Sequence, residues 1–249
     1  MAVDLSGQAA VVTGASSGLG RRFAEVLAQA GARVALVARR ADRLADLAQA
    51  LGERSLAIPE DIGRSGAAAR IFDAAEAALG PVGILVNNAG VAVTRPSVDI
   101  TEDDIEAMFA ANVRAPLLLS REFARRRIAI GAPGRIVNLS SIGAFVHTGA
   151  VSSAVYSITK AAVTRMTEVH AVEWAAHHIN VNAIAPGLFE TEMSAAADPA
   201  QLARVAAGMR RGRVGQPGQL DTTLLYLLDP ASVFVTGTCI KVDDAQMAR

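Results

Sequence analysis

Tyr156 and Lys160 are the two residues whose types and spacing best suit chemistry. Residues four apart share one face of a helix, so the phenol and the ammonium group would lie one turn apart. A phenol with an ordinary pKa of about 10 exchanges protons poorly at neutral pH, and a nearby cation lowers that pKa by favouring the phenolate. The pair is therefore a candidate general acid/base. Because this spacing also occurs by chance in many helices, the hypothesis depends on the elements around it.

A glycine-rich stretch, residues 13–20, comes directly after the first apolar run and reads Thr-Gly-Ala-Ser-Ser-Gly-Leu-Gly. Glycines between a strand and a helix let the backbone approach a diphosphate at the helix N-terminus, where N–H groups favour anions. The spacing G-x-x-x-G-x-G in this context predicts a dinucleotide-binding turn. Two alternatives are a turn without a ligand and a G-x-S-x-G nucleophile elbow built on Ser16, for which no histidine is an obvious partner.

Arg39 and Arg40 end the second apolar run, and the acidic residue that would bind a ribose 2′-hydroxyl there is missing. Two guanidinium groups suit a 2′-phosphate and offer bidentate geometry. The arginines therefore predict that NADP(H) is preferred as cofactor, with NAD(H) still possible. The alternative is that both are solvated residues that open the next helix.

The composition excludes several classes of protein. The 24 Lys and Arg residues balance 24 Asp and Glu residues, so nothing indicates a nucleic-acid or anionic-membrane surface. Cys239 is the only cysteine, which excludes an intrachain disulfide and fits a cytoplasmic protein, and we expect it to be buried in a late strand. No metal site is expected, because His177 and His178 lack the clustered partners that zinc needs.

Neither the N-terminus nor the longest uncharged stretch indicates a membrane segment. The N-terminus lacks the basic start and apolar core of a signal peptide. Residues 136–159 carry no charged side chain, but Ser, Thr, Gly and Asn are scattered among them. We therefore expect a buried strand and the loop after it at this place.

Short apolar runs rich in Val and Ile alternate with longer amphipathic segments from residue 9 onward. The runs predict strands near 9–13, 33–38, 55–58, 83–87, 135–140, 179–185 and 238–242. The longer segments predict helices at 18–30, 41–51, 64–79, 102–114 and 154–177. Strands without polar alternation that are joined by helices indicate a parallel sheet covered on both faces.

We therefore predict an α/β fold with a single domain over residues 1–249: a Rossmann-type, doubly wound parallel sheet of about seven strands with helices on both faces. A glycine- and proline-rich segment at about 188–218 breaks the rhythm and is expected to be a mobile excursion on the substrate side. The three arginines at 125–127 are expected to form a solvated helix face.

The motifs occur in the order and spacing of the short-chain dehydrogenase/reductase family, which the chain resembles from about residue 5 to 244. The matching positions are Thr13–Gly20, Asp61-Ile62, Asn87–Gly90, Asn112, Ser141, Tyr156 with Lys160, and Pro186-Gly187. Each motif alone is weak, whereas the ordered set is specific. The resemblance implies a nicotinamide-dependent oxidoreductase that forms a homotetramer or a homodimer.

The resemblance implies four catalytic residues. Asn112 would hold a water in a proton relay, and Ser141, rather than its neighbour Ser140, would be the catalytic serine. Tyr156 would be the acid/base, and Lys160 would lower its pKa and bind the nicotinamide ribose. The residue types agree with these roles: as a hydride reaches a carbonyl carbon, Ser141 can donate a hydrogen bond to the oxygen while Tyr156 delivers a proton.

The resemblance also implies where the cofactor binds: the glycine-rich turn, an adenine contact after the third strand, a segment after the fourth strand, and a segment that grips the nicotinamide end. With the two arginines and the acid/base pair, the predicted cofactor-binding residues are Gly14, Ser16, Ser17, Gly18, Leu19, Gly20, Arg39, Arg40, Asp61, Ile62, Asn88, Ala89, Gly90, Tyr156, Lys160, Pro186, Gly187, Leu188 and Thr191.

The chain departs from the family pattern in two places. The interval 142–155 is slightly longer than is common, and it borders the expected substrate pocket. The predicted substrate contacts are Ser141, Phe145, His147, Val151, Ser153 and Tyr156, with an ordinary loop position as the alternative for His147. Residues 242–245 read Val-Asp-Asp-Ala where the family usually has Val-Asp-Gly-Gly.

The resulting hypothesis is an oxidoreductase that transfers a hydride between NADP(H) and a small carbonyl or secondary-alcohol substrate. One alternative is a reductase of 3-oxoacyl thioesters of carrier protein or CoA, with Arg210, Arg211 and Arg213 meeting the anionic substrate. An alternative from another class is a non-catalytic protein that senses NADP(H).

Overall fold

The seven strands in the described part of the chain lie in one parallel sheet. The computed structural model describes residues 3–147, 152–195, 205–207 and 209–246. The strand order is β3-β2-β1-β4-β5-β6-β7, and every neighbouring pair is parallel. The strands are β1 (Ala9–Thr13), β2 (Arg33–Ala38), β3 (Ser55–Pro59), β4 (Val82–Asn87), β5 (Gly134–Leu139), β6 (Ile179–Pro186) and β7 (Cys239–Val242). The order reverses direction between β1 and β4, which is the switch point where ligands bind in open α/β sheets.

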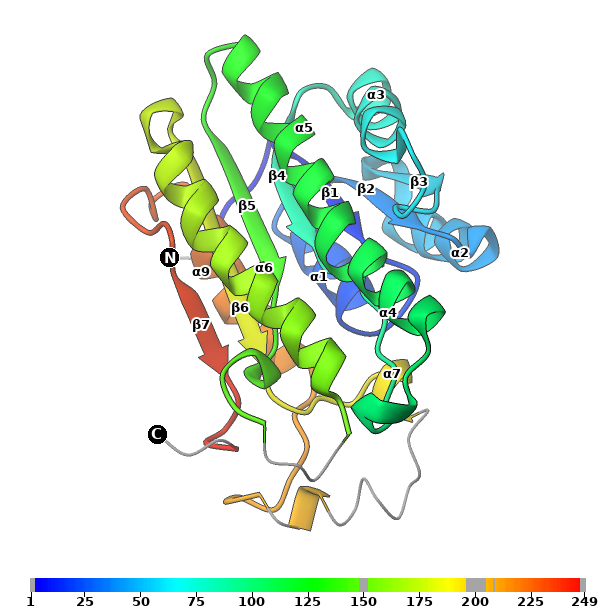
Figure 1. The fold of residues 1–249 in the computed structure, drawn as a ribbon. Coiled ribbons are helices and arrows are strands. Elements are labelled where there is room, and N and C mark those ends of the chain that lie inside the picture. The colour runs from blue at the N-terminus through cyan, green and yellow to red at the C-terminus, as the bar shows by residue number, and fades with distance from the viewer. Residues whose placement is uncertain (1–2, 148–151, 196–204, 208, 247–249) are drawn as a thin grey trace.

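Helices cover both faces of this sheet. They are α1 (Gly18–Gln29), α2 (Ala41–Leu51), α3 (Ala67–Leu79), α4 (Glu102–Phe109), α5 (Ala115–Ala129), α6 (Ala154–Glu173), α7 (Glu192–Ala195) and α9 (Asp221–Leu228). Figure 1 shows α5 and α6 in front of the sheet, with α1 and α9 behind it. The predicted doubly wound α/β fold is therefore confirmed.

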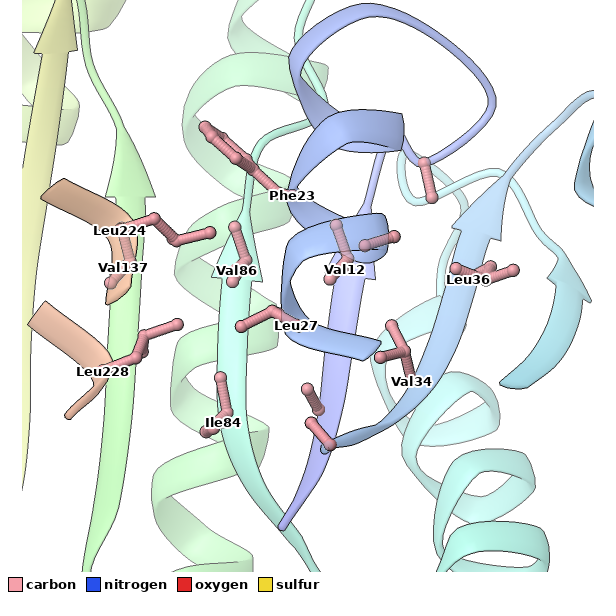
Figure 2. Packing of buried hydrophobic residues seen from close by; sticks show 14 of the residues in the cluster. Val12, Phe23, Leu27, Val34, Leu36, Ile84, Val86, Val137, Leu224 and Leu228 are labelled. Carbon is pink, nitrogen blue, oxygen red and sulfur yellow. The ribbon is translucent and has the colours of Figure 1, made fainter. Parts of the chain in front are cut away.

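Alternate residues of each central strand face opposite layers. Val12 of β1 belongs to the apolar cluster that includes Phe23 of α1 and Leu224 of α9, as Figure 2 shows. Its neighbour Val11 belongs to a second cluster, with Phe123 of α5 on the other face. Because both faces of the strands are buried, the apolar runs show no polar alternation, and this is the pattern from which the parallel sheet was predicted.

Two helices were missed by the sequence prediction. The segment expected to end at 114 continues through a π-helical turn, Ala110–Arg114, directly into α5, and α9 was also not predicted. Helix α5 has no clean apolar stripe, because its many arginines interrupt the period by which helices are recognised. Arginine side chains can bury their long apolar stems, so their presence does not mark an exposed face.

The prediction of a solvated helix face at 125–127 is wrong for two of the three arginines. Arg127 is buried, with 9% of its surface exposed, and its guanidinium donates to the carbonyl oxygen of Pro133 at 2.7 Å and 2.9 Å. Arg126 forms ion pairs with Asp73 and Glu76, which tie α5 to α3, and a further one with Glu122 of its own helix. Only Arg125 is largely exposed, with its side chain paired to Glu122 of the same helix.

Within the described ranges, no helix is both long and apolar enough to cross a membrane. The same part of the chain contains no group of three or more His, Cys, Asp or Glu residues arranged to hold a metal ion. Cys239 opens β7, as expected of a late strand, and is half-buried there. Burial raises the pKa of its thiol to about 11, so the thiolate is scarce at neutral pH.

Candidate active site

The candidate site lies where the carboxyl ends of β1, β4, β5 and β6 meet. Parallel strands all end at the same edge of a sheet, so the residues that follow them come close together even when they are far apart in the chain. Ser141 follows β5 closely, and the segment beginning at Asn88 follows β4. Helix α6 passes beside both and contributes the tyrosine and the lysine.

Tyr156 and Lys160 both lie in the first two turns of α6, as the spacing predicted. The Tyr156 side chain is hydrogen-bonded to that of Ser141. The Lys160 ammonium lies 5.6 Å from the centre of the Tyr156 ring and donates to the carbonyl oxygen of Leu139 at 2.7 Å. Ser140 instead bonds to the Lys160 carbonyl and to Thr164, so of the two serines it is Ser141 that reaches the phenol.

Burial dominates the electrostatics of this pair. It raises the pKa of Tyr156 above its ordinary value, and the hydrogen bond with Ser141 opposes this more weakly. It also lowers the pKa of Lys160, which is only 5% exposed, to about 8. The net effect is a raised pKa for Tyr156, because the cost of burying a phenolate exceeds the effect of the Ser141 hydrogen bond. Tyr156 holds its proton at neutral pH and is available as a donor.

Asn112 lies in the π-helical turn and is 1% exposed. Its Oδ1 accepts from the Val91 amide at 2.8 Å, while its Nδ2 donates to the Val91 carbonyl at 2.8 Å and to Thr159 Oγ1 at 3.0 Å. A Cβ atom on Gly90 would lie 3.1 Å from Asn112 Oδ1 and 3.5 Å from Lys160 Nζ. Asn112 therefore clamps the segment after β4 to α6, and its predicted water-holding role stays a prediction.

The glycine-rich turn is shaped by its own packing. A Cβ atom on Gly20 would lie 2.3 Å from the Gly14 carbonyl oxygen, and Gly14 has a φ of 71°. The side chain of Asn88 donates to the Thr13 carbonyl at 2.9 Å, and Thr13 Oγ1 accepts from the amides of Asn88 and Ala89 at 3.0 Å and 3.1 Å. The predicted cofactor residues after β1 and after β4 are thus held together.

The start of α1 suits an anion. Its N-cap residue, Ser17, makes no capping hydrogen bond with its side chain, and the first turn contains no acidic residue. The amides at the helix N-terminus therefore face the edge of the sheet with the positive end of the helix dipole. This arrangement fits a nucleotide diphosphate.

Arg40 and Arg39 have different surroundings. Arg40 reaches the glycine-rich turn, where Nε and Nη2 donate to Ser16 Oγ at 3.1 Å and 2.9 Å and Nη2 donates to Ser17 Oγ at 2.7 Å. Arg39 is exposed and forms no hydrogen bond or ion pair within the described part of the chain. Of the two predicted arginines, the structure brings Arg40 alone to the turn.

The amino-acid sequence of residues 8–202 matches the family model described as short chain dehydrogenase. The chain belongs to the short-chain dehydrogenase family. L-xylulose reductase of Bos taurus is 36% identical over 254 residues, with 100% of this chain and 100% of that one covered. The 2-dehydro-3-deoxy-D-gluconate 5-dehydrogenase of Escherichia coli (strain K12) is 34% identical over 251 residues, with 100% of this chain and 98% of that one covered. A solved short-chain type dehydrogenase/reductase from Mycobacterium marinum has a TM-score of 0.93 at 31% identity, covering 99% of this chain and 98% of that one.

As a member of this family, the protein is a hydride-transfer oxidoreductase with a nicotinamide cofactor. The residues present fit such a cofactor, since the glycine-rich turn and the start of α1 offer a diphosphate site beside the buried Tyr156 and Lys160. The alternative in which Ser16 is a nucleophile is disfavoured, because its Oγ accepts two hydrogen bonds from Arg40.

Two further predicted cofactor positions of this short-chain dehydrogenase follow β3. Asp61 Oδ1 accepts from the Gly63 amide at 2.9 Å and so shapes the turn that leads toward α3. Ile62 packs against the apolar cluster beneath that helix. Both are half-buried at the same edge of the sheet as the glycine-rich turn, and their assignment to the adenine stays a prediction.

The segment after β6 is held by the C-terminal turn. The Gly187 amide donates to the Val242 carbonyl at 2.9 Å, and the Leu188 amide donates to Gln246 Oε1 at 2.6 Å. A Cβ atom on Gly187 would lie 2.1 Å from that Gln246 oxygen, so a larger residue there would have to displace the Gln246 side chain. Thr191 begins the next turn and accepts from the Ser194 amide at 3.2 Å.

The same C-terminal turn holds the far end of the excursion at 188–218. Asp244 pairs with Arg211 at 3.0 Å and with Arg213 at 2.7 Å, although its backbone φ of 49° lies in the left-handed region. The two arginines hold the pKa of this carboxyl below its ordinary value. The Asp-Ala pair that departs from the family's Gly-Gly therefore supplies a carboxylate that pairs with two arginines of the excursion.

Replacing Asp244 with asparagine is expected to loosen this attachment and to speed tryptic cleavage after Arg211 and Arg213 a few-fold. Asparagine tolerates the left-handed conformation nearly as well as aspartate does, so the change removes the charge without adding backbone strain. The measurement is the rate of limited proteolysis, with Asp229→Asn as the control outside the excursion. Equal cleavage rates in wild type and Asp244→Asn would show that the ion pairs do not hold the segment.

The predicted substrate contacts lie beside this region. Phe145 is 39% exposed and lies under Lys241, whose Nζ is 4.2 Å from the ring centre. His147 is exposed, Ser153 is the N-cap of α6, and Val151 lies outside the described residues. Their contact with substrate stays a prediction.

Two residues near the site were missed by the sequence prediction. Arg43 lies one turn after Arg40 on α2, and both arginines form ion pairs with Glu192 of α7. The helical spacing from Arg40 to Arg43 was a usable signal, because residues three apart on a helix share a face. No signal in the sequence links either arginine to Glu192.

Proposed function

We propose that the protein interconverts a ketone and a secondary alcohol on a small hydroxylated substrate, with NADP(H) as the preferred cofactor and Tyr156 as the acid/base. The observation that carries the chemistry is the Ser141–Tyr156 hydrogen bond beside the buried Lys160, next to the diphosphate-binding turn. The two related enzymes are named for L-xylulose and for 2-dehydro-3-deoxy-D-gluconate, which supports a sugar-derived carbonyl compound as the class of substrate.

In the proposed reaction, the nicotinamide supplies or accepts the hydride. Ser141 donates a hydrogen bond to the substrate oxygen on which negative charge grows during reduction. Tyr156 transfers its hydroxyl proton to that oxygen, and its raised pKa keeps the proton in place until the charge develops. Lys160 places a positive charge beneath the phenol and so stabilises the phenolate that remains. Oxidation of an alcohol uses the same groups in reverse.

The NADP(H) preference rests on Arg40, whose guanidinium lies against both serines of the glycine-rich turn. Arg40→Gln is expected to raise the Kd of 2′,5′-ADP at least about tenfold, because charge-assisted hydrogen bonds to a phosphate are lost. The Kd of 5′-AMP should change little. The measurement is isothermal titration calorimetry, with Arg54→Gln as a control, since Arg54 is exposed just before the amino end of β3. Equal losses for the two nucleotides would refute the assignment.

The 3-oxoacyl thioester alternative is less favoured. It relied on Arg210, Arg211 and Arg213 meeting an anionic substrate, and two of these arginines are already paired with the carboxylate of Asp244. We also propose the homotetramer or homodimer that the family resemblance implies, which light scattering of the purified protein would test.

A further inference from the structure

The side chain of Glu192 lies between Arg40, which belongs to the predicted 2′-phosphate site, and Arg43 of α2. Its Oε2 accepts from Arg40 Nη1 at 2.8 Å, and its Oε1 is hydrogen-bonded to Arg43 Nη1. The other nitrogens of Arg40 are bonded to Ser16 and Ser17. One carboxylate from α7 therefore completes a polar cluster whose other members follow β1 and β2 or lie in α2.

This carboxylate occupies the place of an anion. The two guanidinium groups lower the pKa of Glu192 to about 2, so it is charged throughout the neutral range. The side chains are 40%, 42% and 51% exposed in Arg40, Arg43 and Glu192, so each pair lies in water and is weak. A stronger anion can displace this carboxylate without unfolding any element.

We propose that Glu192 is a cofactor-specificity residue: its carboxylate competes with the adenosine 2′-phosphate for Arg40 and Arg43, and so narrows the preference for NADP(H) over NAD(H). The inference rests on the NADP(H) preference proposed above. A 2′-phosphate carries a charge of about −1.5 to −2 and three acceptor oxygens, so it displaces the Glu192 carboxylate from the two arginines. Because the carboxylate competes for the same arginines, the net affinity for the 2′-phosphate is lower than it would be without Glu192. Both anions cannot occupy one pair of guanidinium groups without repulsion.

The same residue accounts for an absence noted in the sequence. Chains that bind NAD(H) commonly have an acidic residue after the second strand for the ribose 2′-hydroxyl, and this chain has arginines there. Glu192 brings a carboxylate to that place from a segment 152 residues further along the chain. When the nucleotide has a 2′-hydroxyl, the carboxylate stays on the arginines and is available as an acceptor.

The test is nucleotide binding to wild type and to Glu192→Gln, measured by calorimetry at one fixed ionic strength. Glu192→Gln is expected to bind 2′,5′-ADP about threefold to tenfold more tightly than wild type, because the competing charge is gone. Binding of 5′-AMP should stay within about twofold of wild type. Glu190→Gln is the matched control, since Glu190 is also exposed, lies two residues away, and forms no ion pair among the described residues.

The outcomes separate this inference from the NADP(H) preference. Unchanged or weaker binding of 2′,5′-ADP by Glu192→Gln would refute the proposed competition. An equal gain of 2′,5′-ADP affinity in Glu190→Gln would also refute it, by showing a general effect of removing negative charge. Wild type that binds 2′,5′-ADP no more tightly than 5′-AMP would refute the NADP(H) preference instead. In that case a gain of 2′,5′-ADP affinity in Glu192→Gln would still establish Glu192 as the competitor, and no gain would reject it.

Discussion

Replacing Tyr156 with phenylalanine is expected to lower kcat by about a hundredfold to ten-thousandfold, the range for loss of a general acid/base. The Kd of the nicotinamide cofactor should change far less than kcat, because the ring and its packing on α6 are retained. The measurement combines steady-state kinetics on a panel of sugar-derived ketones with direct titration of NADPH. Turnover by Tyr156→Phe equal to that of wild type would sink the assignment of Tyr156.

Ser141→Ala is the matched variant for this experiment. Ser141 contributes a hydrogen-bond donor and not the transferred proton, so its loss should cost about a hundredfold in kcat. Because the two side chains act on one oxygen, the double variant should be little worse than Tyr156→Phe alone. Full additivity of the two losses would indicate that they act at different steps.

Replacing Lys160 with methionine is expected to lower kcat by about a hundredfold, yet to leave the fold at least as stable at pH 7. The pKa of Lys160 falls from 10.5 to about 8 on burial, which means that the buried charge destabilises the folded state by about 3 kcal/mol. Methionine has no such cost, although it leaves the Leu139 carbonyl without its hydrogen bond, a loss of about 1 to 3 kcal/mol.

The pH dependence of stability identifies the charge as the cause. Between about pH 8 and 10.5 the unfolded lysine binds a proton that the folded lysine has released, so the free energy of unfolding of wild type rises with pH across this window. Below about pH 8 both states are protonated, and the full cost is present. Urea unfolding at pH 7, 9 and 10 should show this rise in wild type and not in Lys160→Met. The same pH dependence of the unfolding free energy in both proteins would contradict the assignment to the Lys160 charge.

The sequence was sufficient for the fold because both faces of the central strands are buried. Unbroken apolar runs such as the one containing Val11 and Val12 can be satisfied only by a sheet with helices on either side. Helix α5 was missed because no such regular apolar pattern marks it. Its arginines are tied to α3 and to the Pro133 carbonyl, and such contacts between elements leave no period in the sequence.

The same distinction holds for the candidate site. Tyr156 and Lys160 are neighbours on one helix, so their proximity follows from spacing alone. Glu192 meets Arg40, and Asp244 meets Arg213, across 152 and 31 residues of chain, so only the folded structure brings them together. The direction of the Tyr156 pKa depends on burial, whose extent cannot be read from residue types.

The π-helical turn at Ala110–Arg114 makes the candidate site sensitive to the length of the chain as well as to its composition. A π-turn is an α-helix with one residue too many, and that extra residue sets the rotation of α4 relative to α5. Removing one residue there would restore a regular helix and turn one half against the other by about 100°. Asn112 would then no longer face Val91 and Thr159, so a single deletion would break a contact that most substitutions in α4 leave intact.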